Sequence, residues 1–306
     1  MPIEGKEFTK EGNRELGEGK FENLLKRAKG LGFCPGVKRA IRLAEESLRK
    51  GKVVYIIDDL IHNEGEMARL KGMGLRVAKD VEEIPSNSFM LVRAHGSPPQ
   101  LLKRAEEKGI KIIDCTCSRV RRAQMMALKL YREGREVIIF GDKEHPEVQA
   151  TLGYIEGKGL VIESEEEAEA IPPLERAGFL CQTTKGGERF LSIAEVLRRK
   201  IEDFRFEDTS CPEVEKRNIV SRAIAKEVDV MVIVGGRRSA NTRRLKEACE
   251  EVGIESYVVE KGEDLKEEWF RGGKRVGITA GLSTPLWEIE AVEREIRKIL
   301  RKIGNE

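Results

Sequence analysis

One pattern of apolar and polar positions repeats from Phe33 to the end of the chain. A short apolar run is followed by a cluster of Gly, His, Ser or Asn, and then by a segment whose apolar positions have helical spacing. Eight such runs predict strands, at residues 52–57, 89–96, 111–117, 136–141, 178–184, 229–236, 256–260 and 275–281. Buried strands that alternate with helices of roughly 10 to 15 residues are typical of parallel sheets covered by helices. The sequence therefore predicts an α/β protein.

The polar clusters come directly after the predicted strands. Open parallel sheets bind their ligands at the carboxyl ends of their strands, where the connecting loops lie. We therefore expect loops that follow several different strands to contribute side chains to one shared site.

Three cysteines divide the chain into segments of similar length. Cys117 follows Cys34 by 83 residues, Cys211 follows Cys117 by 94, and 95 residues remain after Cys211. This spacing predicts three copies of one small α/β unit around a common centre. We expect domain 1 at residues 35–117, domain 2 at 118–210 and domain 3 at 211–303, with residues 22–34 joining domain 3. Residues 1–21 lack apolar periodicity and predict a flexible extension.

The charge balance argues against two classes of partner. The 306 residues include 56 basic and 54 acidic side chains, which give a formal net charge of +2. Binding to nucleic acid or to an anionic membrane usually requires a basic excess, so we expect neither partner. The apolar runs are too short for a membrane span, and we find no signal peptide. We therefore expect a cytoplasmic protein.

The three spaced cysteines predict a metal or cluster site. Cys34 lies in GFCPGVKRAI, Cys117 in DCTCSRV and Cys211 in DTSCPEVEKR, and Cys34 and Cys211 each precede a helical segment. The start of a helix favours a thiolate, which is the form of cysteine that binds metals. The wide spacing excludes the usual zinc-finger and bacterial ferredoxin patterns, in which cysteines are paired or closely grouped.

The other cysteines support different interpretations. Cys115 and Cys117 form a Cys-x-Cys sequence, so a zinc or thiol-redox role for this pair remains an alternative. Cys181 and Cys249 have no such neighbour, and we expect both to be small buried hydrophobic residues.

All three histidines of the chain lie at or just after predicted strand ends. They are His62 in DDLIHNEG, His95 in VRAHGSP and His145 in GDKEHPEV. Further polar side chains in similar places are Ser239, Asn241 and Ser283. Such donors suit a diphosphate held by directed hydrogen bonds, and helix N-termini bind anions. Simple N-capping of the following helices is an equally valid interpretation of each Ser or Asn alone.

Glu147 is the candidate proton donor. It stands two residues after His145, across Pro146, which we expect to fix a tight extended turn that directs both side chains into one cavity. A carboxyl group in a dry pocket has a raised pKa and can act as a general acid. Thr183 and Thr184 add hydroxyl donors after another apolar run.

Taken together, these motifs resemble the 4-hydroxy-3-methylbut-2-enyl diphosphate reductase family. The resemblance runs from about Ala28 to the C-terminal helix and rests on GFCPGVKRA, HN at His62 and Asn63, AHGSP, DCTC, GDKEHPEV, QTT, GGRRSANT and GITAGLSTP, in the order of the family. It implies a trefoil of three small α/β domains around a central 4Fe-4S cluster. Cys117, rather than Cys115, aligns with the family's cysteine.

The resemblance also implies roles for individual residues. The cluster ligands would be Cys34, Cys117 and Cys211, which leaves one iron open to act as a Lewis acid toward the substrate hydroxyl. The residues that bind the diphosphate would be His62, His95, Ser239, Asn241 and Ser283, with His145 nearby.

The implied reaction is the reductive removal of the substrate hydroxyl. Thr183 would orient this hydroxyl, and Glu147 would supply a proton through His145 or water. Two electrons from ferredoxin, flavodoxin or a similar carrier would then yield isopentenyl diphosphate and dimethylallyl diphosphate. A competing hypothesis is a divergent iron-sulfur redox protein on the same scaffold, with a different substrate or none. Another is an α/β phosphate-binding enzyme whose cysteines bind zinc.

Overall fold

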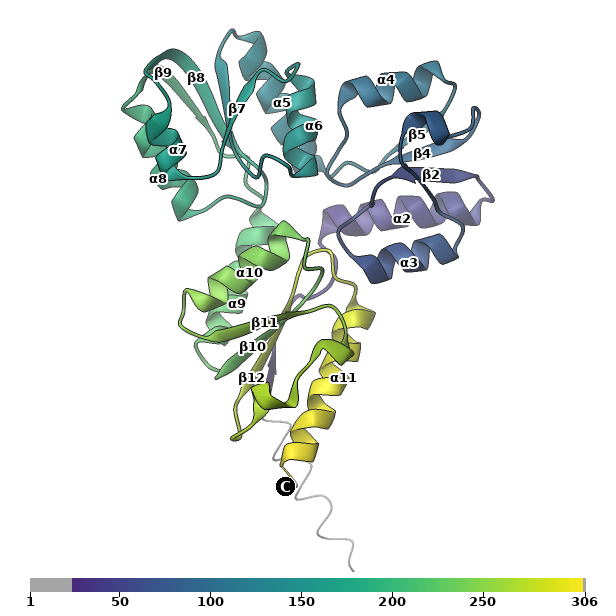
Figure 1. Ribbon diagram of the computed structural model, residues 1–306, viewed down its shortest axis with the longest axis vertical. Coiled ribbons are helices and arrows are strands. Elements are labelled where there is room, and N and C mark those ends of the chain that lie inside the picture. Colours follow the sequence, from purple (N-terminus) through teal and green to yellow (C-terminus); the bar gives the residue numbers. More distant parts are fainter. Residues whose placement is uncertain (1–23, 305–306) are drawn as a thin grey trace, which may run out of the picture.

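The computed structural model describes residues 24–304 and consists of three lobes, each built on a four-stranded sheet (Figure 1). The prediction of an α/β protein is confirmed. Every paired strand in the described residues runs parallel to its neighbour. The predicted extension at residues 1–21 lies outside the described residues.

The three lobes have the following elements. Lobe 1 comprises α2 (Pro35–Arg49), β2 (Val54–Ile57), α3 (Glu64–Gly72), β3 (Arg76–Ala78), a 3₁₀ turn (Val81–Glu83), β4 (Phe89–Val92), α4 (Pro99–Glu107) and β5 (Lys111–Asp114). Lobe 2 comprises α5 (Ser118–Arg132), β6 (Glu136–Phe140), α6 (Pro146–Tyr154), β7 (Gly159–Ile162), α7 (Glu165–Ala170), β8 (Leu174–Cys181), α8 (Glu188–Arg198) and β9 (Ile201–Glu207). Lobe 3 comprises β1 (Leu25–Arg27), α9 (Pro212–Ala225), β10 (Val230–Val234), α10 (Ala240–Glu250), β11 (Glu255–Val259), two 3₁₀ turns (Gly262–Asp264 and Glu267–Phe270), β12 (Val276–Ala280) and α11 (Leu286–Ile303).

The three sheets have one topology. Their strand orders are β3-β2-β4-β5, β7-β6-β8-β9 and β11-β10-β12-β1. In each sheet the first strand has the second strand on one side and the third strand on the other. The fourth strand lies beyond the third, at the edge of the sheet. Lobe 3 takes its fourth strand from the start of the described chain, because β1 pairs with β12 at Leu25 and Val276. The structure thus contains three units with the same sheet topology. The domain boundaries at the cysteines stay a prediction.

All eight predicted strands are present, but four further strands were not predicted. The four are β1, β3, β7 and β9, and each lies at the edge of its sheet. Edge strands contact one neighbour and tolerate charge, which also protects the edge from unwanted pairing. Lys26 and Arg27 in β1 and the alternating charges of β9 therefore hide the apolar pattern that identifies a central strand.

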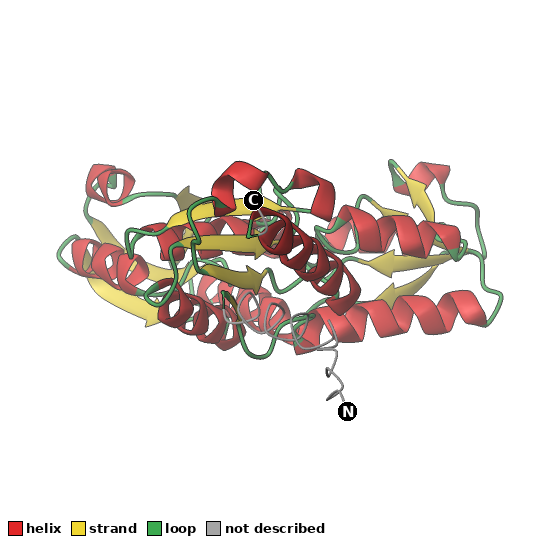
Figure 2. Ribbon diagram, turned by 90° about the horizontal axis from the view of Figure 1, so that it is seen from below, coloured by secondary structure: helices red, strands yellow, loops and turns green. Residues whose placement is uncertain are grey.

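Each lobe has its own hydrophobic core between its sheet and its helices. Figure 2 shows the strands lying between helices in a flattened molecule. Ile56 lies in the core of lobe 1, Phe179 in that of lobe 2 and Ile278 in that of lobe 3. Cys181 and Cys249 are fully buried hydrophobic residues, as predicted. Among the described helices, none has the length and apolar character needed to span a membrane.

Candidate active site

A cavity of about 110 Å³ lies where the three lobes meet. Its wall contains every predicted site residue, namely Cys34, His62, His95, Cys117, His145, Glu147, Thr183, Cys211, Ser239, Asn241 and Ser283. The shared site expected from the strand pattern is therefore present, and the structure brings together residues from all three lobes.

The common topology explains how these residues meet. In each lobe, one polar residue follows the first strand and another follows the third. The pairs are His62 and His95 in lobe 1, His145 and Thr183 in lobe 2, and Ser239 and Ser283 in lobe 3. The first and third strands are adjacent and their connections leave in opposite directions, so a crevice forms between their carboxyl ends. The three crevices open into the same cavity.

The fourth strand of each lobe leads to a cysteine. Cys34, Cys117 and Cys211 are the N-cap residues of α2, α5 and α9. The Cys34 Sγ accepts a hydrogen bond from the backbone N–H of Val37 at 3.5 Å. Burial raises the pKa of Cys34 and of Cys211, while backbone N–H groups at the start of each helix lower it. The helix starts thus oppose the effect of burial and favour the thiolate form.

Gly36 allows the sulfur atoms to face a common space. A Cβ atom at this position would lie 2.6 Å from the Cys117 Sγ and 3.9 Å from the Cys34 Sγ. The neighbouring thiols Cys117 and Cys211 also raise the pKa of Cys34. Three sulfur ligands on three helix starts around one void fit an iron-sulfur cluster, because soft thiolates suit iron-sulfur centres and hard cations prefer oxygen.

Cys115 points elsewhere. It is fully buried in the core of lobe 1, and its Sγ–H donates to the Ile113 carbonyl at 3.7 Å. Burial raises the pKa of its thiol to about 12. This geometry favours Cys117 as the cysteine that faces the cavity.

The three histidines form a compact group. The ring centroids of His62 and His95 lie 4.4 Å apart in a stacked arrangement, and His145 lies edge-on at 5.7 Å and 5.4 Å from them. Burial lowers the pKa of each imidazole, in the case of His145 to about 4. All three rings are therefore neutral near pH 7, and each carries one N–H.

The hydrogen bonds of the histidines indicate an anion rather than a metal ion. Their nitrogens lie within 4.8 Å of one another, a grouping that also occurs at metal sites. However, the His145 Nδ1 accepts the backbone N–H of Glu147 at 3.1 Å, so the proton of this neutral ring is on Nε2. His145 thus presents a donor in place of a free lone pair. Among residues 24–304, the Nδ1 atoms of His62 and His95 have no partner although they are buried.

Lobe 3 adds polar groups that also lack partners. Both amide atoms of Asn241 are buried without a hydrogen bond within the described residues. Asn241 lies in the first turn of α10, and Ser239 is the N-cap of this helix. Buried polar groups are normally satisfied, and the N-terminus of a helix attracts negative charge. Buried polar groups without partners at a helix start are suited to an anionic ligand.

Glu147 is the acid of the cavity. Its side chain is 2% exposed and accepts two hydrogen bonds from Thr183, from the N–H at 2.6 Å and from Oγ1 at 2.7 Å. Burial raises the pKa of Glu147 to about 7, and the bonds from Thr183 counteract part of this effect. The predicted extended turn at Pro146 is wrong, because Pro146 begins α6 and His145 is its N-cap. Proline suits the first position of a helix, since the N–H it lacks is not needed there.

Two residues near the site were not selected from the sequence. Arg119 lines the cavity beside the cysteines, and Glu288 bonds to Asn63, the neighbour of His62. Arg119 follows Cys117 by two residues, a position that could have identified it. Glu288 is one of many acidic residues on amphipathic helices, and no local pattern separates it from the others.

Comparisons with known proteins identify the family to which this chain belongs. The family model for the LytB protein matches residues 25–297. The chain belongs to the LytB family. The 4-hydroxy-3-methylbut-2-enyl diphosphate reductase of Aquifex aeolicus (strain VF5) is 41% identical over 276 residues, which cover 89% of this chain and 95% of the relative. The reductase of the same description from Geobacter sulfurreducens is 37% identical over 275 residues, with 90% and 97% covered.

Solved structures show the same fold as this LytB-family chain. One is the structure of (E)-4-hydroxy-3-methyl-but-2-enyl diphosphate reductase, the terminal enzyme of the non-mevalonate pathway, with 40% identity, a TM-score of 0.66, and 90% and 99% of the two chains covered. Another is the E-1-hydroxy-2-methyl-but-2-enyl-4-diphosphate reductase from Plasmodium falciparum, with 23% identity, a TM-score of 0.84, and 88% and 86% covered. The resemblance inferred from the sequence motifs is thus confirmed.

Proposed function

We propose that this chain is a reductase that converts (E)-4-hydroxy-3-methylbut-2-enyl diphosphate into isopentenyl diphosphate and dimethylallyl diphosphate. The observation that carries the proposal is the composition of the central cavity. One wall has three thiols, another has neutral donors without partners, and a buried acid with a raised pKa lies among them. The family membership and the names of the relatives support the same reaction.

Cys34, Cys117 and Cys211 would hold a 4Fe-4S cluster. When bound, this group would supply electrons one at a time and a Lewis-acidic iron without a protein ligand. The three sulfurs come from three lobes, so the cluster would also connect the lobes at their centre.

The diphosphate would bind to neutral donors from all three lobes. The proposed ligands are His62, His95, His145, Ser239, Asn241 and Ser283. Because the rings are neutral in the protein without ligand, they would meet the anion with directed N–H groups, beside O–H groups and the N-terminus of α10. The same donors would hold the tail of the substrate still while its other end reacts.

Thr183 and Glu147 would act on the hydroxyl group that leaves. The Thr183 hydroxyl would orient it, and Glu147 would deliver a proton through His145 or a water molecule, so that the group departs as water. A carboxyl group with a pKa of about 7 is partly protonated at neutral pH and can both give and regain this proton. Substrate bound in the cavity would displace water from around the reactive intermediate.

The electron donor would be a small carrier such as ferredoxin or flavodoxin. Lys38, Arg119 and Arg122 are exposed at the starts of α2 and α5, beside Cys34 and Cys117. None of these three cations forms an ion pair within residues 24–304. A cation at the start of a helix is disfavoured by the helix dipole, and an acidic partner would offset that cost. The setting would be cytoplasmic, a reducing compartment in which cysteines stay able to bind a cluster.

The test is anaerobic turnover by the reconstituted protein. We expect the iron-loaded chain, with an artificial reductant, to convert the allylic diphosphate into the two products, which mass spectrometry separates from the substrate. Iron-loaded protein that retains its cluster but yields neither product would contradict the proposal and favour a redox protein without this substrate. Protein that binds zinc but no iron would contradict the cluster assignment.

A further inference from the structure

The turn that carries His62 is fixed to lobe 3 by a buried polar contact. The Asn63 Nδ2 donates to the Glu288 Oε2 at 2.7 Å, although the two residues are 225 positions apart. Asn63 is 5% exposed and Glu288 is 8% exposed. The contact joins the start of α3 in lobe 1 to the first turn of α11 in lobe 3.

Two further contacts place the backbone of His62 against lobe 3. The Ser283 hydroxyl donates to the His62 carbonyl at 3.3 Å. Gly236 approaches the same carbonyl so closely that a Cβ atom there would lie 2.7 Å from the oxygen. The position of His62 relative to Ser283, its neighbour in the proposed diphosphate site, thus depends on how lobes 1 and 3 meet at this point.

The amide of Asn63 has a fixed orientation. Its Oδ1 accepts the backbone N–H of Glu66 at 2.7 Å, as the N-cap of α3. The Nδ2 group therefore points away from α3 and needs a separate acceptor, which Glu288 provides. Removal of this acceptor would leave a buried donor without a partner.

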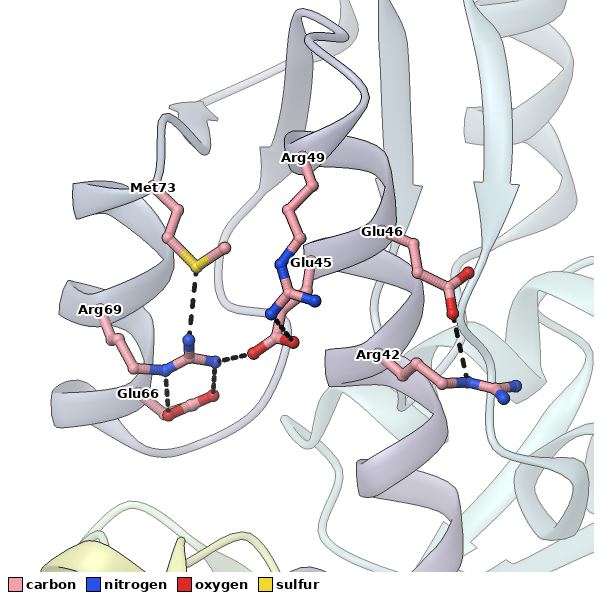
Figure 3. A network of polar contacts seen from close by, with 7 residues as sticks. All are labelled: Arg42, Glu45, Glu46, Arg49, Glu66, Arg69 and Met73. Carbon is pink, nitrogen blue, oxygen red and sulfur yellow. Dashed lines mark hydrogen bonds and ion pairs between the residues drawn. The ribbon is translucent and has the colours of Figure 1, made fainter.

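Helix α3, which begins after Asn63, is also bonded to α2 within lobe 1. Arg69 on α3 bonds to Glu66 at 2.5 Å and to Glu45 of α2 at 2.6 Å (Figure 3). The carboxylate of Glu66 is thus occupied by Arg69, and Glu288 is the group that reaches Asn63 from lobe 3. Helix α3 is tied to α2 on one side and to α11 on the other.

Gly65 makes room for the Glu288 carboxylate on the first turn of α3. A Cβ atom at position 65 would overlap the Glu288 Oε1. The start of a helix favours a negative charge at this place. Burial raises the pKa of Glu288 to about 7, the bond from Asn63 lowers it, and the nearby Glu66 and Glu260 raise it further.

We propose that Glu288 is a positioning residue, which holds the His62–Asn63 turn against lobe 3 and so sets the distance between His62 and Ser283 in the anion site. The inference rests on the proposed function in one respect, namely that this site holds a diphosphate. Glu288 acts through Asn63 and does not touch the substrate.

The first experiment measures the binding of inorganic pyrophosphate to the full-length, iron-loaded protein by calorimetry. We expect Glu288→Ala to weaken binding by roughly tenfold, which corresponds to a turn that holds His62 in its binding position in only about a tenth of the molecules. Glu288→Gln keeps an oxygen acceptor for Asn63 and should restore most of the affinity. Glu290→Ala, which changes an exposed acid on the same helix, is the matched control and should bind like the wild type.

A second variant reaches the same contact from the other side. Gly65→Ala should displace the Glu288 carboxylate and weaken binding in the same way. Combined with Glu288→Ala it should cost little more, since both changes disturb one contact. In turnover assays, Glu288→Ala should raise KM more than it lowers kcat, whereas Glu288→Gln should keep a KM close to that of the wild type.

The outcomes separate the two hypotheses. Wild-type affinity and KM in Glu288→Ala, in a protein that binds pyrophosphate and turns over, would overturn the positioning role alone. Equal losses in Glu288→Gln and Glu288→Ala would also overturn it, because the retained acceptor would then have no effect. A wild-type protein that neither binds pyrophosphate nor turns over would overturn the proposed function and, with it, the site that Glu288 is proposed to serve.

Discussion

Glu147 is held by two opposing influences at the scale of single residues. Burial disfavours its charged form, whereas the N–H and Oγ1 of Thr183 bind its two oxygens and favour that form. The outcome is a carboxyl group with a pKa of about 7, whose position is fixed in the wall of the cavity. Such a group meets both requirements of a general acid, which are geometry and a pKa near the working pH.

Replacing Glu147 tests this role through the pH dependence. The raised pKa means that the acid is protonated below about pH 7 and loses its proton as the pH rises through this value. Turnover of the wild type should therefore fall above pH 7. Glu147→Gln should slow turnover by roughly 10²-fold or more and should remove this pH dependence. Steady-state rates from pH 5.5 to 9 measure both effects; these limits are chosen to span the pKa by about two units.

The control for this change is Glu144→Gln, which alters an exposed acid three residues earlier. This variant should keep the rate and the pH profile of the wild type. Near-normal turnover of Glu147→Gln, at unchanged iron content, would rule out Glu147 as the proton donor.

The neutral histidines predict that protons are taken up when the anion binds. Burial lowers the pKa of His62, His95 and His145 in the free protein, and a bound diphosphate would raise it again. Affinity should therefore increase as the pH falls from about 8 to 6, on either side of the ordinary histidine pKa. Calorimetry with pyrophosphate in buffers of different ionisation enthalpy measures the protons exchanged.

The comparison with His95→Gln removes the contribution of the ligand's own protonation. Glutamine keeps an N–H donor but cannot take up a proton in this pH range. The wild type should therefore take up more protons per bound ligand than this variant. An equal number of protons in both proteins would contradict the assignment of His95 to the anion site.

At the scale of elements, the sequence pattern predicted the central strands and the polar residues at their ends. It did not predict the edge strands or the contacts between lobes. Strands and their polar ends could be predicted because apolar runs mark central strands, and parallel topology brings their carboxyl ends together. Edge strands such as β1 and β9 were hidden by their charges. The contact between Asn63 and Glu288 could not be predicted, since it depends on the packing of two lobes and not on any local pattern.

The helix starts that carry cysteines make a prediction about metal content. Cys211 is an N-cap facing the cavity, whereas Cys115 lies in the core of lobe 1. Cys211→Ser should therefore reduce the iron bound per chain after anaerobic reconstitution, and Cys115→Ser should leave it unchanged. Iron analysis and the absorbance near 400 nm measure this difference, a wavelength at which we expect iron-sulfur clusters to absorb. The reverse order of iron contents would mean that Cys115 is the ligand.

At the scale of the whole molecule, three lobes with separate cores enclose a site that none of them could form alone. Each lobe contributes one cysteine through its fourth strand and two polar residues through its first and third strands. The repeated topology therefore places side chains at equivalent positions in all three lobes. In the proposed function, the differences between the lobes would decide which side chain binds the anion and which supplies the proton. The net charge of +2 conceals a local excess of cations beside Cys34 and Cys117.

This local excess predicts how the electron donor binds. Arg119 lines the cavity with the three cysteines and is exposed, whereas Arg121 on the same helix pairs with Asp114. Arg119→Glu should raise the KM for a reduced acidic carrier by roughly tenfold at low salt, because charge at the rim of an interface mainly changes the rate of association. The difference in carrier KM between the wild type and Arg119→Glu should shrink as salt is added, since the interaction is between exposed charges. Turnover with a small artificial reductant should fall much less than turnover with the carrier, which separates docking from chemistry. Lys298→Glu makes the same change of charge on α11 and should leave the carrier KM unaltered. Equal carrier KM values for the wild type and Arg119→Glu at every salt concentration would place the docking surface elsewhere.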